Sequence, residues 1–449
     1  MKVSVFGAGY VGLVTAVCLA KIGHTVICID NDQNKIHLLA EGISPIYEAG
    51  LEPLLNKFLS TKNIQFTGDP LKAIENSDLM IIAVGTPLDE RGNANLSYVY
   101  QVTQTIAEHL NHSCVIVLKS TSPPGTSETL TRYLHHQLKK KNLNIHCDVA
   151  SNPEFLQEGT AIQQFMHPDR IIVGADNIHT IQTLYDLYQP LIKNKEQFLI
   201  MNKTSAELTK YASNAFLATK VSFMNEISQI AEQVGADIES VRTGMSLDYR
   251  INPLFLNAGC GFGGSCFPKD ISALLASAQH TDVKPFILES VIKRNLTQQQ
   301  LLFHKVNRFF EQQLQGKTIA LWGLTFKPNT DDVRSATSHI LSELFWKAGC
   351  FIKAYDPLGM ENFSKHYPNH PQLELCSSPL DALENADVLV IVTEWNEFKQ
   401  VPLAEIKNRL RYNAIFDGRN ILQPSDATRH QLIYYGIGRS NCEANPRGV

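Results

Sequence analysis

Short apolar runs alternate with segments of helical periodicity along the first part of the chain. The runs are rich in β-branched residues and predict strands at residues 2–6, 25–29, 79–84, 114–118 and 148–150. The segments between them predict helices. This alternation is typical of an α/β protein with a parallel, doubly wound sheet.

The last third of the chain repeats this pattern. Residues 317–323 resemble the first strand and the glycine after it. A helix is then predicted to run to Gly349, and the next strand to end on Asp356, which matches Asp30. Residues 70–78 and 379–387 also resemble each other, and an apolar strand follows each of them. We therefore expect two Rossmann-like, doubly wound halves.

The middle of the chain, residues 204–298, has helical periodicity. Its main element, residues 205–234, contains neither Gly nor Pro and is longer than an average globular helix. We expect this helix to join the two halves and to bury apolar surface against a second subunit, which predicts a homodimer. The expected domains are an N-terminal Rossmann domain at 1–200, a central helical dimerisation domain at 201–300 and a C-terminal Rossmann-like domain at 301–449.

Composition and charge narrow the classes of function. A chain of 449 residues with 44% hydrophobic and 19% charged residues is typical of a globular protein with more than one core. The net charge of −4 offers no attraction to nucleic acid or to an anionic membrane, and no apolar run is long enough to span a bilayer. The nine cysteines are odd in number, scattered and without zinc-ligand spacing, which predicts a reducing cytoplasm and no metal site.

A glycine pattern follows the first predicted strand. In Gly7-x-Gly9-x-x-Gly12 the first glycine makes a tight turn, the second lets the backbone approach a pyrophosphate, and the third allows the helix to pack closely on the strand. Asp30 ends the second strand, where a carboxylate binds ribose hydroxyls and repels a 2′-phosphate, so NAD is favoured over NADP. Lys35 near the same ribose would soften this preference. The alternative is a glycine turn without a ligand. The second half lacks the pattern and is not expected to hold a dinucleotide in the same way.

The segment 261–270 carries a cysteine in a glycine-rich loop. Pro268 suits the first turn of a helix, so Cys266 is predicted to lie at a helix N-terminus beside Lys269. This position is expected to lower the pKa of the thiol and to make it a better nucleophile. Asp270, four residues on, shares a helix face with Cys266. The alternative is an inert, packed cysteine.

Two further pairs have the same four-residue spacing. Asn152 and the proline after it predict the start of a helix that carries Glu154 and Glu158 on one face. Lys210 and Asn214 share a face of the long central helix. Taken alone, each pair is most often solvated surface.

Other polar positions are weaker candidates. Lys119-Ser120-Thr121 closes an apolar strand at its carboxyl end, where open α/β sheets bind ligands. Lys327 and Arg334, near the first turn of the second half, are candidate anion-binding residues, although exposed cations are common. Residues 167–170, His-Pro-Asp-Arg, are expected to be structural, with the arginine pairing locally.

Together these segments resemble the UDP-glucose 6-dehydrogenase family, part of the UDP-glucose/GDP-mannose dehydrogenases, over nearly the whole chain. The cysteine segment and the Asn-Pro-Glu-Phe-Leu segment at 152–156 are specific to nucleotide-sugar dehydrogenases. The matching segments are 7–12, 45–48, 85–87, 119–121, 152–159, 167–170, 207–217, 255–270 and 326–334.

The resemblance implies a four-electron oxidation of UDP-glucose at C6 to UDP-glucuronate, with two NAD and one water. The first hydride transfer would give an aldehyde, which Cys266 would attack to form a thiohemiacetal. The second transfer would give a thioester, which water hydrolyses. A thiohemiacetal keeps the hydrogen that the second transfer needs, and a thioester is a reactive acyl donor.

The same matching implies roles for individual residues. Lys210 and Asn214 would stabilise oxyanions at C6, while Glu154, Asp270 and Thr121 would position water and move protons. With Cys266 these six form the expected catalytic set. The expected cofactor contacts are Gly7, Gly9, Tyr10, Val11, Gly12, Asp30, Lys35, Thr86, Thr121, Glu158, Lys269 and Arg334. The expected substrate contacts are Glu154, Phe155, Leu156, Glu158, Lys210, Asn214, Phe255, Leu256, Asn257, Ala258, Gly259, Gly263, Lys327 and Arg419.

Several alternatives remain open at this point. GDP-mannose or another nucleotide sugar could replace UDP-glucose, although the His-Pro-Asp-Arg segment and the loop at 255–259 favour UDP-glucose. A two-electron hydroxyacid dehydrogenase would need neither Cys266 nor the second Rossmann-like half. An NAD-binding sensor without catalysis would leave the matched catalytic residues idle. Cys260 stands where many relatives have proline, and we expect it to be neutral for function.

Overall fold

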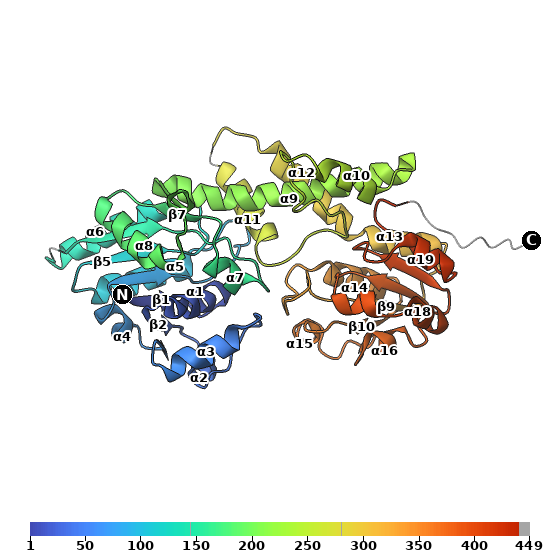
Figure 1. The fold of residues 1–449 in the computed structure, drawn as a ribbon, viewed down its shortest axis with the longest axis horizontal. Helices are drawn as coiled ribbons and strands as arrows, with labels where there is room; N and C mark the ends of the chain where they lie inside the picture. The colour runs from blue at the N-terminus through green and yellow to red at the C-terminus, as the bar shows by residue number, and fades with distance from the viewer. Residues whose placement is uncertain (144, 280, 440–449) are drawn as a thin grey trace, which may run out of the picture. The chain divides into compact units, whose positions relative to one another are not determined.

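The computed structural model describes residues 1–143, 145–279 and 281–439 (Figure 1). The chain forms two compact units. The first contains residues 1–213 and 272–283, and the second contains residues 214–271 and those from 284 onward. Two helices, α9 (Lys203–Val234) and α11 (Phe267–Ala278), contribute residues to both units. The division of the sequence at residues 200 and 300 remains a proposal.

The first unit is built on an eight-stranded sheet with strand order β3-β2-β1-β4-β5-β6-β7-β8. Neighbouring strands are parallel except β6 and β7, which are antiparallel. Its strands are β1 (Lys2–Phe6), β2 (Thr25–Ile29), β3 (Ile64–Thr67), β4 (Leu79–Ile82), β5 (Cys114–Leu118), β6 (Cys147–Ser151), β7 (Ile171–Gly174) and β8 (Phe198–Met201). Its helices are α1 (Tyr10–Lys21), α2 (Gln33–Ala40), α3 (Leu51–Ser60), α4 (Pro70–Glu75), α5 (Ser97–His109), α6 (Thr126–Lys140), α7 (Ala161–Met166) and α8 (Ile178–Tyr188), with 3-10 turns at Gln189–Leu191 and Lys195–Gln197. The expected parallel, doubly wound sheet is thus confirmed.

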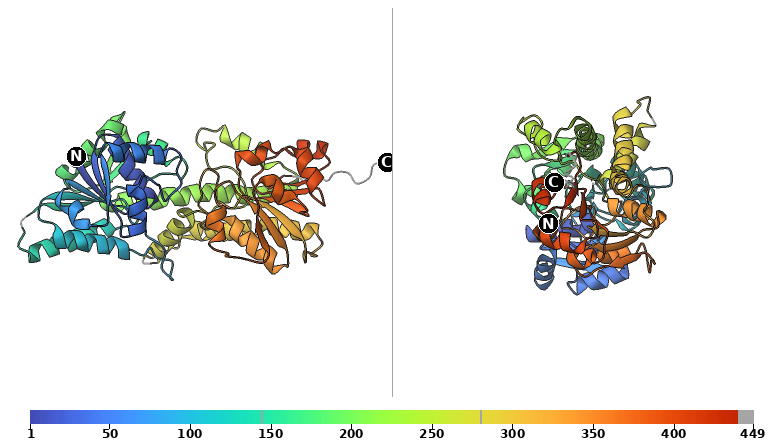
Figure 2. Two further views of the ribbon diagram at one scale, coloured as in Figure 1. Left: turned by 90° about the horizontal axis from the view of Figure 1, so that it is seen from below. Right: turned by 90° about the vertical axis from the view of Figure 1, so that its right-hand side faces the viewer.

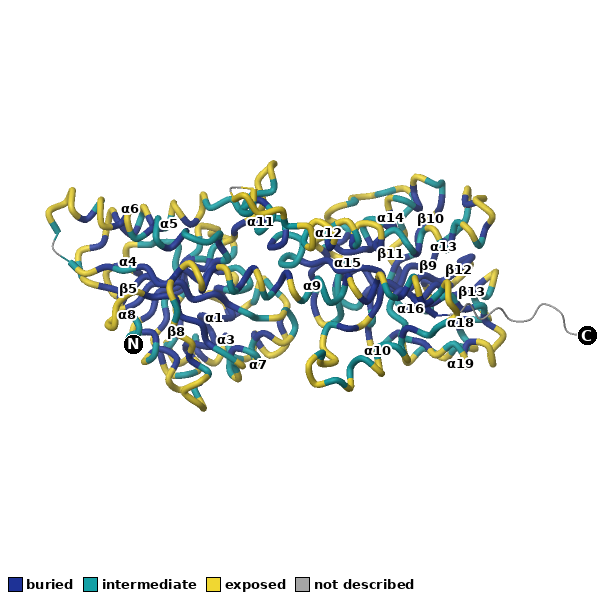
Figure 3. The backbone as a smooth tube through the Cα atoms, turned by 90° about the horizontal axis from the view of Figure 1, so that it is seen from above, coloured by how far each residue is buried: buried dark blue, intermediate teal, exposed yellow. Residues whose placement is uncertain are grey.

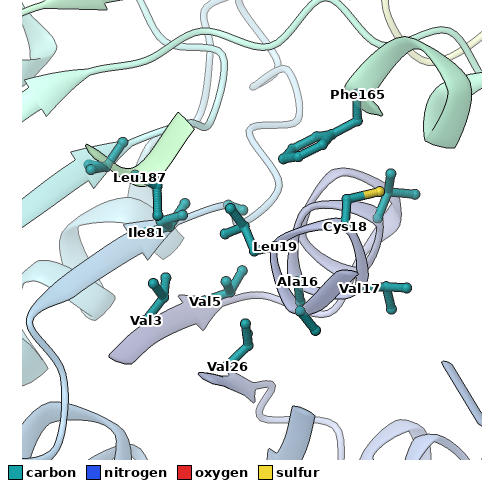
Figure 4. Close-up of a cluster of buried hydrophobic side chains, with 14 of the residues drawn as sticks. Val3, Val5, Ala16, Val17, Cys18, Leu19, Val26, Ile81, Phe165 and Leu187 are labelled. Carbon is teal, nitrogen blue, oxygen red and sulfur yellow. The ribbon is translucent and has the colours of Figure 1, made fainter. Parts of the chain in front are cut away.

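The core of the first unit surrounds α1. Residues 12–20 of this helix are all buried, because the sheet covers one side and α3 and α7 cover the others. Figure 4 shows Leu19 of α1 pointing toward Val5 of β1 and Phe165 of α7 lying near Cys18. Gly23 follows the end of the helix with a φ of +102°, a left-handed conformation that glycine adopts without strain. In Figure 3 the buried residues follow the strands, and the exposed residues lie mainly on the outer helices and loops.

The second unit has a six-stranded parallel sheet with strand order β11-β10-β9-β12-β13-β14. Its strands are β9 (Thr318–Trp322), β10 (Phe351–Tyr355), β11 (Leu373–Leu375), β12 (Val388–Ile391), β13 (Ala414–Asp417) and β14 (Ile433–Tyr435). Its helices are α10 (Ile238–Ser246), α12 (Phe286–Gln299), α13 (Leu301–Phe309), α14 (Thr337–Lys347), α15 (Met360–Ser364), α16 (Pro379–Leu383), α17 (Asn396–Gln400), α18 (Leu403–Arg409) and α19 (Pro424–Arg429). The predicted second Rossmann-like half is confirmed; its sheet, shown in Figure 2, repeats the winding of the first six strands.

The sequence repeat has a structural cause in both units. Asp78 accepts a hydrogen bond from the backbone N–H of Lys2, at the start of β1 (3.0 Å). Asp387 accepts the same bond from the N–H of Thr318, at the start of β9 (2.7 Å). In each unit, therefore, an aspartate just before the fourth strand fixes the beginning of the first strand.

The two units differ at the end of their second strands. Asp356 is fully buried, and its carboxylate accepts bonds from backbone N–H groups of Leu324, Thr325 and Gly359 and from the Trp395 indole. The acceptor positions of the Asp356 carboxylate are therefore taken up by donors of the protein itself. Asp356 is thus not placed to serve a ribose as Asp30 is expected to do.

The prediction of a helix that begins at Asn152 is wrong. Residues 152–157 form neither helix nor strand, and the next helix is α7. Asn152 does not cap a helix, because its side chain donates to the Ile172 carbonyl (2.8 Å) and accepts from Lys119 Nζ (3.1 Å) and the Tyr188 hydroxyl (2.6 Å). Glu154 folds back to accept a bond from the N–H of Leu156 (2.6 Å). These side-chain contacts hold the segment as a loop.

Candidate active site

The glycine turn has the geometry of a dinucleotide site. Gly7 has a φ of +104°, and a Cβ there would lie 2.6 Å from the Ala83 carbonyl oxygen. A Cβ at Gly12 would lie 1.8 Å from the Gly7 carbonyl oxygen, whereas one at Gly9 would meet no atom within 4 Å. The helix α1 begins directly after Gly9 with no side-chain cap on its N–H groups. The turn therefore presents an open backbone and a helix N-terminus suited to a pyrophosphate.

Asp30 is held in place beside this turn. Its carboxylate accepts bonds from the N–H groups of Ala8 (2.8 Å) and Asp32 (3.0 Å) and from Lys35 Nζ (3.0 Å). Burial acts to raise the pKa of Asp30, but these bonds and the charge of Lys35 outweigh it and lower the pKa. An ionised Asp30 suits ribose hydroxyls. Lys35 was expected near the ribose, and its ammonium lies beside the Asp30 carboxylate that is expected to bind the ribose.

Glu48 is a residue to which the sequence assigned no role. It accepts a hydrogen bond from the Tyr10 hydroxyl and from the N–H groups of Gly159 (2.6 Å) and Ala161 (2.8 Å). Burial and the neighbouring Glu48 carboxylate raise the pKa of Tyr10, so this tyrosine stays a neutral donor. Glu48 thus links the glycine turn to the loop after Glu154. The only sequence signal for Glu48 is that residues 45–48 match the family pattern.

The carboxyl ends of β4 and β5 are tied together. Ser120 Oγ donates to the Val84 carbonyl (2.7 Å), and Thr86 Oγ1 donates to the Thr121 carbonyl (2.8 Å). Because Thr86 bonds the backbone of Thr121, the two expected cofactor residues lie next to each other. They stand at the sheet edge where open α/β sheets bind ligands.

A buried acid and two lysines lie beside that edge. Lys210 Nζ donates to Glu154 Oε1 (3.0 Å), and both side chains are buried. Burial raises the pKa of Glu154, but the charges of Lys210 and Lys119 and the Leu156 N–H outweigh it and lower the pKa. Burial lowers the pKa of Lys119 to about 8. The pair Glu154–Lys210 is therefore an internal ion pair and not solvated surface.

Phe155 lies against two cations. The Arg170 guanidinium is 3.9 Å from its ring centroid and the Lys210 ammonium is 5.4 Å from it. Both distances allow cation–π attraction. Phe155 therefore helps to place Lys210, and Arg170 has a local partner, as expected.

In the second unit, Cys266 directly precedes α11. Among the eight cysteines of the described residues, Cys266 alone is not buried. Asp270, one turn into the helix, donates its N–H to the Cys266 carbonyl (2.8 Å), and its buried carboxylate accepts from Asn214 Nδ2 (2.6 Å) and Lys269 Nζ (2.6 Å). The predicted helix start is thus observed directly after Cys266. The Asn214 side chain is buried against Asp270 and is not solvated surface.

The expected substrate loop approaches Arg419. A Cβ at Gly259 would lie 3.1 Å from Arg419 Nη1, and one at Gly263 would lie 2.3 Å from the Ser335 carbonyl oxygen. Arg419 donates to the Val392 carbonyl (2.7 Å) and pairs with Glu394 (3.2 Å). Leu256 and Ala258 are buried, Asn257 is exposed, and Phe255 adopts a φ of +62°.

Lys327 and Arg334 lie in the loop after β9. The Lys327 ammonium is 5.5 Å from the ring centroid of Phe326. Arg334 makes a bidentate ion pair with Asp332 (2.6–3.0 Å). Their expected anion-binding roles remain proposals.

Comparison with known proteins places these residues in a family. Residues 1–192 match the NAD binding domain of the UDP-glucose/GDP-mannose dehydrogenase family, 204–297 match its central domain, and 320–424 match its UDP binding domain. The chain belongs to this family. This confirms the predicted fold, the NAD cofactor and the assignment as a dehydrogenase.

Individual relatives cover nearly the whole chain. The UDP-glucose 6-dehydrogenase of Pseudomonas aeruginosa is 43% identical over 451 residues, which span 99% of this chain and 100% of the relative. The solved structure of a UDP-glucose dehydrogenase from Pyrobaculum islandicum has a TM-score of 0.90 and 33% identity, with 98% of both chains covered. That of a UDP-D-ManNAc dehydrogenase from Pyrococcus horikoshii has a TM-score of 0.85 and 26% identity, with 98% of this chain and 99% of the other covered.

Within residues 1–143, 145–279 and 281–439, no helix is long and apolar enough to cross a membrane. The same residues contain no group of three or more histidine, cysteine or acidic side chains that could hold a metal ion.

Proposed function

We propose that this family member oxidises UDP-glucose at C6 to UDP-glucuronate, with two NAD and one water consumed for each sugar. The family match, the UDP binding domain and the similarity to proteins named UDP-glucose 6-dehydrogenase support this substrate. The single observation that carries the chemistry is Cys266, the one partly exposed thiol among the described cysteines, at a helix start beside Asp270.

The first unit holds the cofactor in this proposal. The turn at Gly7, Gly9 and Gly12, with Tyr10 and Val11 opening α1, binds the pyrophosphate, and Asp30 binds the adenosine ribose. When NAD is bound, it supplies the acceptor for each hydride. The further proposed cofactor contacts are Lys35, Thr86, Thr121, Glu158, Lys269 and Arg334.

The second unit supplies the nucleophile. After the first oxidation, Cys266 Sγ bonds to the C6 aldehyde carbon, and the carbonyl oxygen takes a proton to give a thiohemiacetal. Loss of the remaining C6 hydride and of the hydroxyl proton leaves a thioester. Water then adds to the acyl carbon, the C–S bond breaks, and the thiol takes back a proton as the carboxylate leaves.

Buried polar side chains serve the charges that develop at C6. Lys210 and Asn214 follow each other by one turn on α9 and are both buried, so they suit the stabilisation of an oxyanion. Glu154 bonds Lys210 and Asp270 bonds Asn214, which places one acid beside each donor. With Thr121, these acids are proposed to orient water and to move protons.

The substrate is proposed to contact two loops, three cationic side chains and Asn214. The residues are Glu154, Phe155, Leu156, Glu158, Lys210, Asn214, Phe255, Leu256, Asn257, Ala258, Gly259, Gly263, Lys327 and Arg419. Arg419 lies against Gly259 in the second unit, which supports a shared role for the loop and this arginine.

A homodimer through α9 is part of the proposal. Phe216, Phe223 and Ile230 recur every seven residues on this helix and are all exposed. A seven-residue apolar repeat is typical of a helix that packs on another helix. We propose a reducing cytoplasmic setting, in which the Cys266 thiol stays reduced. Light scattering of the intact protein should give twice the chain mass, and Phe223→Glu should lower it to one chain.

The first experiment counts NADH formed per UDP-glucose consumed, with excess NAD, for the wild type and Cys266→Ser. Two NADH per sugar, with turnover lost or stalled in the variant, is the expected result. One NADH per sugar and an unaffected variant would reduce Cys266 to a structural residue. No turnover of UDP-glucose, with turnover of UDP-ManNAc or GDP-mannose, would move the chain to another substrate of the same family.

A further inference from the structure

The chain that leads to Cys266 is irregular and buried. Residues 256–266 contain no helix or strand, and residues 258–264 are all buried. Gly261 and Gly264 adopt φ values of +96° and +86°. A buried loop of this kind leaves backbone N–H and C=O groups without the partners that a helix or strand would supply. Each such group needs another partner inside the protein.

Four buried carboxamide side chains supply many of these partners. Asn225 Oδ1 accepts from the Gly259 N–H (2.8 Å), and Gln298 Nε2 donates to the Gly259 carbonyl (2.7 Å). Asn295 bonds both backbone groups of Phe262, accepting from its N–H (2.8 Å) and donating to its carbonyl (2.9 Å). Gln299 Nε2 also donates to that carbonyl (3.1 Å). We call these four side chains the amide cradle.

The geometry of the amide cradle is local and tight. Asn225 comes from α9, and the other three come from one stretch of α12. A Cβ at Gly261 would lie 2.7 Å from Gln299 Cγ and 3.0 Å from Asn295 Oδ1, so the loop backbone packs directly on these side chains. Two backbone hydrogen bonds hold other residues of the loop. The Cys260 N–H donates to the Gly418 carbonyl (2.9 Å), and the Gly264 N–H donates to the Arg334 carbonyl (2.8 Å).

Carboxamides suit this task better than other side chains. One amide carries both a donor and an acceptor and bears no charge, so it can satisfy an N–H and a C=O of the same peptide segment. A carboxylate could only accept, and its buried charge would need a counter-ion. An apolar side chain in place of Asn295 would remove the acceptor of the Phe262 N–H and leave the Phe262 carbonyl with the Gln299 amide as its donor.

We propose that the amide cradle consists of positioning residues for the thiol, with Asn295 as the main one. Asn295 holds Phe262 by two bonds, four residues before Cys266, and thereby fixes the path of the loop toward α11. This inference rests on the proposed function in one respect, the role of Cys266 as nucleophile. The cradle places the nucleophile in advance of substrate binding, which favours attack at a fixed carbon.

The test compares Asn295→Ala with Ser222→Ala. Ser222 is buried, and its Oγ donates to the Val291 carbonyl (3.4 Å), so the control removes a bond between the same two helices without touching the loop. The assays are kcat with UDP-glucose, calorimetric binding of UDP, and the rate at which iodoacetamide alkylates Cys266, assigned by peptide mapping. The structure does not describe Cys442. Peptide mapping is therefore needed to distinguish alkylation of Cys266 from alkylation of Cys442.

For Asn295→Ala we expect kcat to fall by about ten- to hundredfold, as for a displaced reacting group. The alkylation rate of Cys266 should change by about fivefold or more, while UDP binds within about twofold of the wild type. Ser222→Ala should leave all three values near those of the wild type. Gln299→Ala removes one of the bonds to Phe262 and should shift kcat and alkylation in the same direction by less, which covers the case in which Asn295→Ala fails to fold.

An unchanged kcat and alkylation rate in a folded Asn295→Ala would overturn the proposal. Equal losses in Ser222→Ala would also overturn it, because general loosening of the helices would then be the cause. The alkylation assay needs no substrate turnover. If the wild type fails to oxidise UDP-glucose, the proposed function fails while the effect of the cradle on the thiol is still measured.

Discussion

Lys119 is a buried cation whose removal should make the protein more stable at neutral pH. Its ammonium has one hydrogen-bond acceptor recorded in the described residues, the neutral Asn152 Oδ1 at 3.1 Å, and burial lowers its pKa from 10.5 to about 8. Each tenfold change in proton affinity is worth about 1.4 kcal/mol, so the charged lysine costs the folded state roughly 3 kcal/mol at pH 7. Lys119→Met removes this cost and loses a hydrogen bond worth about 1 kcal/mol, which leaves a net gain of about 2 kcal/mol.

The sign of the pH dependence follows from linkage. Between pH 8 and 10.5 the unfolded chain binds a proton at Lys119 that the folded chain does not bind. Stability of the wild type therefore rises with pH across this window, while the variant lacks this contribution. The advantage of Lys119→Met should be largest below pH 8 and should shrink by roughly 2 kcal/mol between pH 7 and pH 9.5.

The assay uses urea unfolding followed by two signals. All three tryptophans, Trp322, Trp346 and Trp395, lie in the second unit, so their fluorescence reports that unit alone. Far-UV circular dichroism reports both units. Lys119→Met should move the circular dichroism transition to higher urea and leave the tryptophan transition in place.

Lys203 provides the matched control. It is equally buried, but it pairs with Asp148 (2.9 Å) and Asp176 (2.8 Å). Burial lowers the pKa of Lys203, but the hydrogen bonds to these aspartates outweigh it and raise the pKa. Its contribution to stability is thus fully present at neutral pH and is lost only as pH rises through this raised pKa. Lys203→Met should therefore destabilise the first unit by about 1.5–3 kcal/mol at pH 7. A destabilised Lys119→Met at pH 7, or an advantage that does not change with pH, would refute the reasoning.

Three further predictions concern the first unit. Gly9→Ala should fold normally but lose NAD affinity in a binding titration, whereas Gly12→Ala should lower the melting temperature, because only the second Cβ meets the protein itself (1.8 Å); equal stability of the two variants would contradict this. Asp30→Asn should raise KM for NAD by about ten- to hundredfold and lower KM for NADP, since the repulsion ends and Lys35 is released; an unchanged NAD/NADP ratio in steady-state kinetics would argue against it. Glu207→Gln should cost about 1.5–3 kcal/mol and speed amide exchange at residues 125–127, where the carboxylate bonds the start of α6 (2.6–2.7 Å); unaltered exchange there would remove this role.

The elements that could be predicted from the sequence depend on local patterns. The strands at 2–6, 25–29 and 114–118 coincide with β1, β2 and β5, because each is a short apolar run bounded by turn residues. The long central helix was also predicted, since no Gly or Pro interrupts it. The repeat of residues 70–78 at 379–387 indicated the second Rossmann-like unit. Asp78 and Asp387 now explain that repeat, as each binds the first strand of its unit.

What could not be predicted depends on partners distant in sequence. Asn152 followed by proline has the local signature of a helix start, yet Lys119, Tyr188 and Ile172 engage its side chain and the segment forms a loop. Glu48 gave no local signal, because its partners lie at Tyr10 and after residue 158. A capping rule counts only nearby residues, so it fails wherever tertiary bonds take the capping side chain.

The placement of buried charge along α9 suggests why this helix bears so many polar residues. Lys203, Glu207, Lys210 and Asn214 follow at intervals of four, three and four residues, so they share one stripe of the helix. Lys203 and Glu207 are satisfied by groups of the first unit, from Asp148 to the start of α6. These two anchors fix the axial position of the helix before the stripe reaches Lys210. A helix held only by apolar contacts could slide or rotate at little cost. Displacement of α9 would instead leave the buried charges of Lys203 and Glu207 without their partners. The proposed oxyanion donors are thus held in place by ion pairs and hydrogen bonds that take no part in the reaction.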